Sequence, residues 1–180
     1  MRKLLNQELN RLSVEEFKSS AKTPIIIVLD NVRSLLNIGS VFRTADAFSV
    51  EAIYLCGITG TPPNKEINKT ALGSTNSVVW KYFKTTLEAV KELKESNYKI
   101  YSIEQAEKSI HLNNFIPDQN SKLAVVFGHE VDGVAQEIVN LSDGVIEIPQ
   151  TGTKHSLNVS VSVGVVIWDL FLKVQANRPA

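Results

Sequence analysis

The sequence lacks the features of secreted, membrane-spanning and strongly charged proteins. Its 19 basic and 19 acidic residues balance, so no global field attracts nucleic acid, and an RNA or DNA partner would need a local patch. Cys56 is the one cysteine, which excludes a disulfide framework, and no apolar run near the amino end resembles a signal peptide. The long apolar stretch 159–172 is interrupted by Ser160, Ser162, Gly164 and Asp169. These absences predict a soluble, reduced protein of the cytoplasm without a membrane segment.

Signals for several common kinds of chemistry are missing as well. The side chains that could ligate a metal do not have the usual ligand spacing, so no metal site is predicted; they are His111, His129, His155 and Cys56. No G-x-S-x-G motif is present, which argues against a serine hydrolase. No G-x-G-x-x-G follows the first apolar run, which argues against a dinucleotide-dependent oxidoreductase.

Short apolar runs alternate with segments of helical spacing along most of the chain. The runs are 25–29, 51–56, 78–82, 99–103, 123–127 and 145–148, and the helical segments are 36–48, 85–96 and 134–141. The helix over 85–96 is announced by the Thr85-x-x-Glu88 capping box. This alternation predicts an α/β fold with a mostly parallel sheet flanked by helices.

The length of 180 residues suits one sizeable core, so we expect a single domain over 23–175. Residues 1–22 would form a helical extension outside it. Leucines at positions 4, 5, 9 and 12 among polar residues predict an amphipathic helix over 1–18. Segment 61–65 contains two prolines and is predicted as a loop.

The apolar segment from Leu157 onward fits a strand by its valines and a helix by its length. We favour a helix that is buried on nearly all sides and capped by Ser156. Ser160 and Gly164 lie four residues apart and would let another helix or a partner subunit approach closely. The alternative is a packed core helix with no interface.

Three polar segments are candidates for chemistry, and the first spans 37–45, after the first strand. There Gly39 permits close approach of another backbone, and Arg43 offers a planar fork suited to phosphate. The alternative reading of Arg43 is a solvated or ion-paired surface residue.

The second segment, 127–133, leaves the fifth strand with glycines on both sides of three polar residues, where α/β proteins tend to bind ligands. A polar turn before a helix is its alternative reading.

The third segment joins 146–150 to 156–160. An apolar strand runs into a turn stopped by proline, then a loop with one glycine over 151–155, then a polar helix start. This order places backbone donors and the side chain of Asn158 around one cavity. The segment therefore has the character of a ligand site.

In this order the three segments resemble those of the SpoU family of RNA ribose methyltransferases, within the SPOUT superfamily that includes TrmH-type tRNA enzymes. The resemblance covers roughly residues 25–172. It implies a deep trefoil knot, in which the C-terminal part of the chain threads through a loop, although chains ordinarily avoid threading. It also implies S-adenosylmethionine as cofactor, methyl transfer to a ribose 2′-hydroxyl of RNA, and a homodimer in which both subunits contribute to the site.

The resemblance assigns roles residue by residue. The cofactor-binding positions are Ile103, Gly128, Ile148 and Leu157. The catalytic positions are Arg43, with Asn37, Glu130, Ser156 and Asn158 as the polar shell around it. In the family this arginine is often proposed as the base itself, assisted by the adjoining phosphate. We prefer a clamp on that phosphate that stabilises developing negative charge, because a guanidinium is costly to deprotonate. The chain departs from the family pattern at His129, Gln150, Glu104 and Gln105.

The choice of RNA rests on fewer residues. Segment 69–74 with Trp80 resembles TrmH-type enzymes that act on tRNA, so tRNA 2′-O-methylation, with guanosine as the modified base, is the favoured function. The ribosomal branch often carries a separate N-terminal RNA-binding domain, which we do not expect here. Methylation of ribosomal RNA and non-catalytic RNA binding are the alternatives. The local basic patch would consist of Arg33, Lys65, Lys69 and Lys154.

Overall fold

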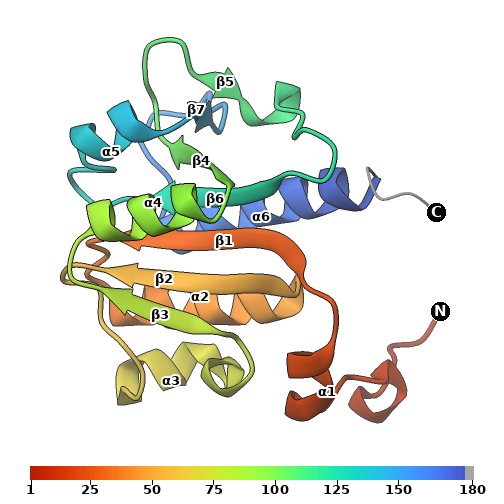
Figure 1. Cartoon of the computed structure of the whole chain (residues 1–180). Coiled ribbons are helices and arrows are strands. Elements are labelled where there is room, and N and C mark those ends of the chain that lie inside the picture. The colour runs from red at the N-terminus through yellow and green to blue at the C-terminus, as the bar shows by residue number, and fades with distance from the viewer. Residues whose placement is uncertain (177–180) are drawn as a thin grey trace.

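A computed structural model of the chain describes residues 1–176 and consists of one parallel sheet covered by helices on both faces (Figure 1). The sheet has seven strands in the order β3-β2-β1-β6-β4-β7-β5, and every neighbouring pair is parallel. The strands are β1 (Thr23–Asp30), β2 (Val50–Cys56), β3 (Trp80–Phe83), β4 (Tyr98–Ile103), β5 (Ile110–His111), β6 (Lys122–Phe127) and β7 (Gly144–Glu147). The predicted α/β class is thus confirmed.

The helices are divided between the two faces of the sheet. They are α1 (Val14–Ser19), α2 (Leu35–Ala47), α3 (Lys65–Ala71), α4 (Thr86–Glu95), α5 (Gln136–Leu141) and α6 (Val159–Ala176), with short 3₁₀ turns η1 (Asn6–Leu9), η2 (Ser74–Asn76) and η3 (Leu112–Asn114). In Figure 1, α4 lies in front of the sheet, while α2 and α6 lie behind it. The buried residues agree with this division, because α2, α3 and α6 share one core cluster and α4 and α5 share the other.

The alternation of side chains along the central strand creates these two cores. In β1, Ile25, Ile27 and Leu29 join the cluster with α2 and α6, while Ile26 and Val28 join the cluster with α4. Successive residues of a strand point to opposite faces, so a strand covered on both sides is apolar throughout. β1 lies between β2 and β6, which explains its continuous apolar run.

The predicted N-terminal helix over 1–18 is wrong. The segment forms η1 and then α1 instead. Asn10 adopts a left-handed conformation (φ 45°) that ends η1, and the side-chain oxygen of Ser13 then caps α1. Leu4, Leu5 and Leu12 are exposed instead of covering an apolar face. The amino end projects at the lower right of Figure 1, while Phe17 of α1 packs into the core. β1 begins at Thr23, and the division into an extension over 1–22 and a domain over 23–175 stays a prediction.

The C-terminal segment is a helix, as predicted, but its start and its surroundings differ from the prediction. It begins at Val159, and Asn158 rather than Ser156 caps it, because the Asn158 Oδ1 accepts from the Ser160 backbone amide at 2.9 Å. It is not buried on nearly all sides. Four of its apolar side chains are 40–50% exposed: Val161, Val165, Trp168 and Leu172.

Within residues 1–176, α6 is also the one helix with the length and apolar composition of a membrane span. Its inward residues belong to the core between the helix and the sheet: Val163, Val166, Ile167 and Leu170 have no exposed surface. The apolar residues of α6 therefore form two faces, an inner one packed against the sheet and an outer one that nothing in the described chain covers.

Several boundaries shift from the predicted ones. The third strand lies at Trp80–Phe83 instead of 78–82, and the helix predicted at 134 begins at Gln136. Besides the 3₁₀ turns, two elements were not predicted: the seven-residue α3, which Asn64 caps immediately after the two prolines, and the two-residue β5. Both are too short for hydrophobic periodicity to reveal. Threading of the C-terminal segment into a trefoil knot stays a prediction.

Candidate functional site

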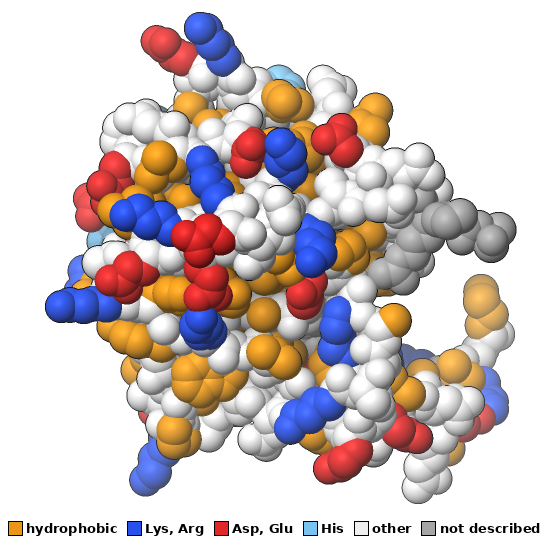
Figure 2. All heavy atoms as spheres, in the orientation of Figure 1, with side chains coloured by type: hydrophobic (Ala, Val, Ile, Leu, Met, Phe, Trp, Pro, Cys, Tyr) orange, Lys and Arg blue, Asp and Glu red, His pale blue; other side chains and the backbone are white. Residues whose placement is uncertain are grey.

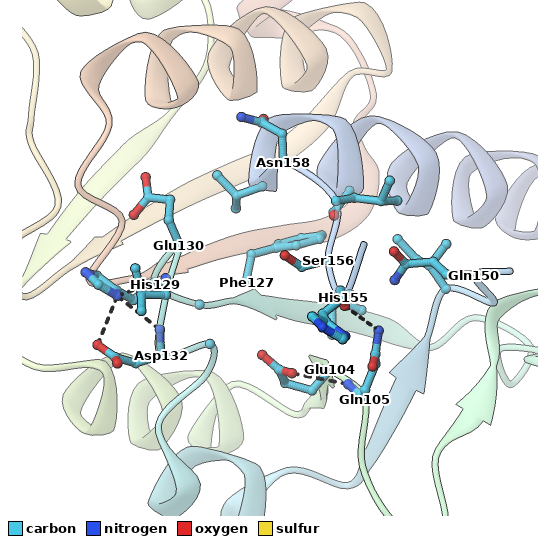
Figure 3. Close-up of a pocket in the computed structure, with 18 residues that line it drawn as sticks. Glu104, Gln105, Phe127, His129, Glu130, Asp132, Gln150, His155, Ser156 and Asn158 are labelled. Atoms are coloured by element: carbon cyan, nitrogen blue, oxygen red, sulfur yellow. Dashed lines mark hydrogen bonds and ion pairs between the residues drawn. The ribbon is translucent and has the colours of Figure 1, made fainter. Parts of the chain in front are cut away.

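The carboxyl ends of β4, β6 and β7 surround a cavity of about 620 Å³ (Figure 3). Parallel strands bring their carboxyl ends to one edge of the sheet, where α/β proteins bind ligands. All four residues predicted to bind the cofactor line this cavity: Ile103, Gly128, Ile148 and Leu157. Phe127 adds a further apolar side chain, and polar side chains, among them Glu104 and Gln105, complete the lining (Figure 3).

The loop 128–134 closes tightly on itself at one side of the cavity. A Cβ atom on Gly128 would lie 2.0 Å from the carbonyl carbon of Gly133, so only glycine fits there. Reciprocal backbone hydrogen bonds of 3.0 and 2.9 Å join His129 and Gly133. Glu104, at the end of β4, accepts a hydrogen bond from the Val134 amide at 3.0 Å and holds the loop against the strand. The loop is therefore a shaped wall of the cavity rather than a polar turn alone.

Glu130 connects this loop to the start of α2. Its carboxylate oxygens accept from the backbone amides of Arg33 and Ser34 at 3.1 and 2.9 Å. Desolvation tends to raise the pKa of Glu130, but these two amides and the side chain of Asn37 stabilise the charged form and hold the pKa below its ordinary value. Glu130 thus acts as a positioning residue for α2.

The lowered pKa of Glu130 leads to a pH-dependent prediction. We expect Glu130→Gln to lower the free energy of unfolding at neutral pH, because the amide loses the charge-assisted bonds to Arg33 and Ser34. The difference in unfolding free energy between wild type and variant should be at its full size above the ordinary carboxyl pKa of 4.5. It should shrink as the pH falls through the lower pKa that Glu130 has in the folded protein. Urea unfolding of both proteins from neutral to acidic pH measures this. Glu137→Gln, on the exposed side of α5, is the matched control. A wild-type advantage that is unchanged in acid contradicts the assignment.

Two asparagines from opposite ends of the sequence meet at the rim of the cavity. The Asn158 amide donates to the Asn37 Oδ1 at 3.2 Å, while the Asn158 Oδ1 caps α6. Asn37 lies in the first turn of α2, whose N-cap is Ser34. Ser156 lines the cavity without capping a helix. The structure therefore brings together Glu130, Ser156, Asn158 and Asn37 of the predicted polar shell.

Arg43 lies apart from this group. It is exposed on the outer face of α2, it does not line the cavity of its own chain, and its guanidinium makes no hydrogen bond or ion pair within residues 1–176. In the same segment, Gly39 permits the close approach of another backbone, as predicted. Gly39 touches the backbone of α3, because a Cβ there would lie 2.2 Å from the Ile67 carbonyl oxygen.

Sequence reasoning missed two side chains that shape the mouth of the cavity. Gln105 donates from its Nε2 to the His155 carbonyl oxygen at 2.9 Å and joins the loop after β4 to the loop before α6 (Figure 3). Glu104 holds the 128–134 loop, as described above. Both positions stood out in the sequence as departures from the family pattern, which was the available signal. Three carboxylates line the cavity, Glu104, Glu130 and Asp132, and no lysine or arginine of the described chain does.

The predicted basic patch is partly neutralised. Lys69 forms an ion pair with Glu66 at 2.6 Å, whereas Arg33, Lys65 and Lys154 have no carboxylate within 4.0 Å in the described part of the chain. Figure 2 shows basic and acidic side chains interspersed over the face that carries α4. A nucleic-acid surface would therefore rely on a few cations.

Comparisons with known proteins point in one direction. The sequence model described as the SpoU rRNA methylase family matches residues 24–168. The chain is 32% identical over 162 residues to a tRNA (guanosine(18)-2′-O)-methyltransferase of Thermus thermophilus, covering 90% of this chain and 81% of that protein. It is 27% identical to a 23S rRNA (guanosine-2′-O-)-methyltransferase of Vibrio cholerae, covering 96% of this chain and 68% of the relative.

Solved structures agree with the sequence comparisons. The TrmH/SpoU tRNA modifying enzyme of A. aeolicus superposes with a TM-score of 0.80 at 26% identity, over 91% of this chain and 81% of that one. An AdoMet-bound rRNA methyltransferase from Sinorhizobium meliloti gives a TM-score of 0.75 at 24% identity, over 83% of this chain and 56% of that one. The second likeness concerns the fold alone.

Proposed function

The chain belongs to the SpoU rRNA methylase family, and we propose that it transfers the methyl group of S-adenosylmethionine to a ribose 2′-hydroxyl of RNA in the cytoplasm. The observation that carries this proposal is the cavity at the ends of β4, β6 and β7. Three segments far apart in the sequence converge on it, and they supply all four residues proposed to bind the cofactor. The hydrogen-bonded pair Asn37 and Asn158 marks its open rim.

The residues of the cavity fit S-adenosylmethionine. Apolar walls from Ile103, Ile148 and Leu157 suit an adenine ring, and the tight turn at Gly128 exposes backbone groups to its polar edge. The ligand carries a positive sulfonium, and a lining with three carboxylates and no lysine or arginine favours a cation. When bound, the cofactor supplies an electrophilic methyl group on that sulfonium.

The chain itself must exclude water and stabilise charge on the acceptor oxygen. The apolar walls limit competing water around the methyl group. The 2′-hydroxyl develops negative charge as its proton leaves, and a guanidinium is the strongest fixed donor available for that charge and for the adjoining phosphate. We assign this role to Arg43, as a donor rather than as a base. Glu130, Ser156, Asn158 and Asn37 position the elements around it.

The position of Arg43 supports a homodimer. The exposed residues of α6 at 161, 165, 168 and 172 recur at intervals of four, three and four and form one apolar stripe on the helix. A groove beside them, lined by Leu112, Gly164, Val165 and Trp168, is apolar as well. Exposed apolar patches of this kind are characteristic of interfaces. We propose that a second copy covers this stripe and that Arg43 of one subunit serves the cavity of the other.

We propose tRNA as the RNA substrate and guanosine as the modified nucleoside. The support is the 32% identity to a tRNA guanosine methyltransferase, compared with 27% for the ribosomal relative, together with segment 69–74. Because both relatives methylate guanosine by name, the base is better supported than the RNA. Ribosomal RNA is the second candidate, and a non-catalytic RNA-binding protein of this fold is the third.

Methyl transfer with labelled cofactor tests these alternatives directly. Purified protein is incubated with transcribed tRNAs and, separately, with fragments of 23S ribosomal RNA, and the labelled nucleoside is identified after digestion. We expect 2′-O-methylguanosine in tRNA. Label in ribosomal RNA alone would overturn the tRNA assignment, and no label in any RNA despite cofactor binding would support the non-catalytic alternative.

The cofactor assignment has its own prediction. Leu157 is exposed toward the cavity, so Leu157→Trp should fill it without disturbing the core. We expect the affinity for S-adenosylmethionine to fall by about tenfold, in line with the cost of overpacking a site. Isothermal titration calorimetry measures this, with Leu141→Trp on the exposed side of α5 as the control. An unchanged dissociation constant for the Leu157 variant would place the cofactor elsewhere.

A further inference from the structure

A second cavity, of about 450 Å³, lies beside the edge strand β3 and is separate from the cofactor site. Its apolar wall consists of Trp80, at the start of β3, and of Pro62 and Pro63 in the loop before α3. Two amide side chains complete it, Asn68 from α3 and Asn76 from η2. None of these residues lines the first cavity.

The polar groups of this cavity are available to a ligand. Asn68 and Asn76 are exposed, and neither side-chain amide makes a hydrogen bond within residues 1–176. Each amide offers one acceptor and two donors. Lys65 lies one turn before Asn68 on the same face of α3, and its ammonium has no carboxylate partner in the described chain. An aromatic ring and two amides that make no hydrogen bond in the described chain thus meet at one hollow, and Lys65 lies on α3 outside its lining.

This combination matches the chemistry of an unpaired nucleotide. RNA-binding proteins stack splayed-out bases on aromatic side chains and read the base edges through hydrogen bonds, and a lysine pairs with the phosphate. A purely apolar ligand would displace water from both amides without replacing its hydrogen bonds, whereas the edge of a base can pair with them. The cavity therefore favours a flat base with polar edges.

The cavity is coupled to the proposed catalytic helix. α3 packs directly on α2, because the Ile67 carbonyl oxygen touches Gly39 and the Thr70 hydroxyl donates to the Leu36 carbonyl oxygen at 2.8 Å. Leu36 is the neighbour of Asn37, and Arg43 lies on the same helix. A base held at α3 would therefore lie one helix away from the arginine that we assign to the acceptor ribose.

We propose that this second cavity binds an unpaired nucleobase of the substrate RNA, on a nucleotide near the one that is methylated. The inference rests on the proposed function for the presence of an RNA substrate. It assigns Trp80 to stacking, Asn68 and Asn76 to the base edge, and Lys65 to the phosphate of the same nucleotide.

The test combines protein variants with RNAs that lack one base. The double variant Asn68→Ala/Asn76→Ala changes exposed side chains without bonds, so its fold should be intact; Trp80→Leu removes the stacking surface but also part of a packed residue. Asn140→Ala, an exposed asparagine on α5, is the control. Dissociation constants are measured by filter binding, without cofactor, for an RNA that the wild type binds and for a series with a single abasic nucleotide at each position around the modified one.

We expect the double variant to bind the intact RNA about tenfold more weakly than wild type, because the hydrogen bonds to the base edge are lost. One abasic position should cost wild type a larger factor than it costs the double variant, which has already lost the base-edge contacts and keeps only the stacking on Trp80. Losses that multiply at every abasic position, or wild-type affinity of the double variant, would overturn the inference. A further outcome is that the protein variant and the missing base show non-additive binding losses at one RNA position while the protein transfers no methyl group. That result would uphold the inference and overturn the proposed function.

Discussion

Replacing Arg43 by alanine should reduce methyl transfer by about a hundred- to a thousandfold, the usual loss when a donor to developing negative charge is removed. The affinity for S-adenosylmethionine should not change, because the role we assign to Arg43 is toward the acceptor oxygen and the adjoining phosphate of the RNA, and the residues proposed to bind the cofactor are others. Stability should also be preserved, since the side chain is exposed and makes no bond within the described chain. Single-turnover methylation at saturating cofactor and calorimetry of cofactor binding measure the two quantities separately.

Two further variants sharpen this result. Arg43→Lys keeps the charge but loses the planar fork, so its activity should lie between those of wild type and alanine variant. Arg11→Ala removes an exposed arginine of the N-terminal segment and should behave as wild type. Full activity of Arg43→Ala would remove Arg43 from the reaction, and loss of cofactor binding in it would point to a misplaced cavity.

Placing a carboxylate in the stripe of α6 should separate the proposed dimer and abolish activity. Val165 lies in the middle of the stripe and lines the apolar groove beside it. In Val165→Asp an unpaired charge would be buried on association, at a cost of about 3–5 kcal/mol, which corresponds to a loss of at least about a hundredfold in dimer affinity. We expect a dimer for wild type and a folded monomer for the variant in sedimentation equilibrium.

The control for this experiment is Ile58→Asp, which adds the same charge at an exposed isoleucine away from the stripe and should remain dimeric and active. A mixture of two impaired variants tests whether the subunits share a site, when methylation is assayed at a cofactor concentration well below that needed to fill the Leu157→Trp cavity. Mixed dimers of Arg43→Ala and Leu157→Trp contain one cavity of normal shape that faces an intact arginine from the other subunit, so activity should return on mixing. Mixed dimers that form but stay inactive would show that Arg43 serves its own chain. A wild type that sediments as a monomer would refute the dimer.

Local signals in the sequence determined much of the sheet and two of its helices. β1, β2, β4 and β6 lie where their apolar runs predicted them. α2 and α4 begin and end within a residue of the predicted bounds, because Ser34 and Thr85 cap them and apolar residues recur on one face. These features depend on neighbours in the chain, which a single sequence displays.

Features that depend on distant partners were less accessible. In the sequence, the outward face of α6 is as apolar as the inward one. Its exposure therefore could not be predicted without knowing how the helix packs on the sheet. The bond between Gln105 and the His155 carbonyl joins residues fifty positions apart, and nothing in the local pattern requires it. The resemblance to a family predicted which residues form the polar shell. It did not predict that Arg43 lies outside the cavity of its own chain.

The bond between Asn37 and Asn158 has a consequence for how the protein comes into being. It joins positions 121 residues apart, and α6 also supplies Val163, Val166, Ile167 and Leu170 to the same core as α2. Synthesis on the ribosome is vectorial and takes several seconds over such a distance, at about 5–20 residues per second. During that interval the segment that carries Asn158 is still missing, so the rim of the cavity cannot be complete. The rim closes only after α6 has been made and has docked on α2.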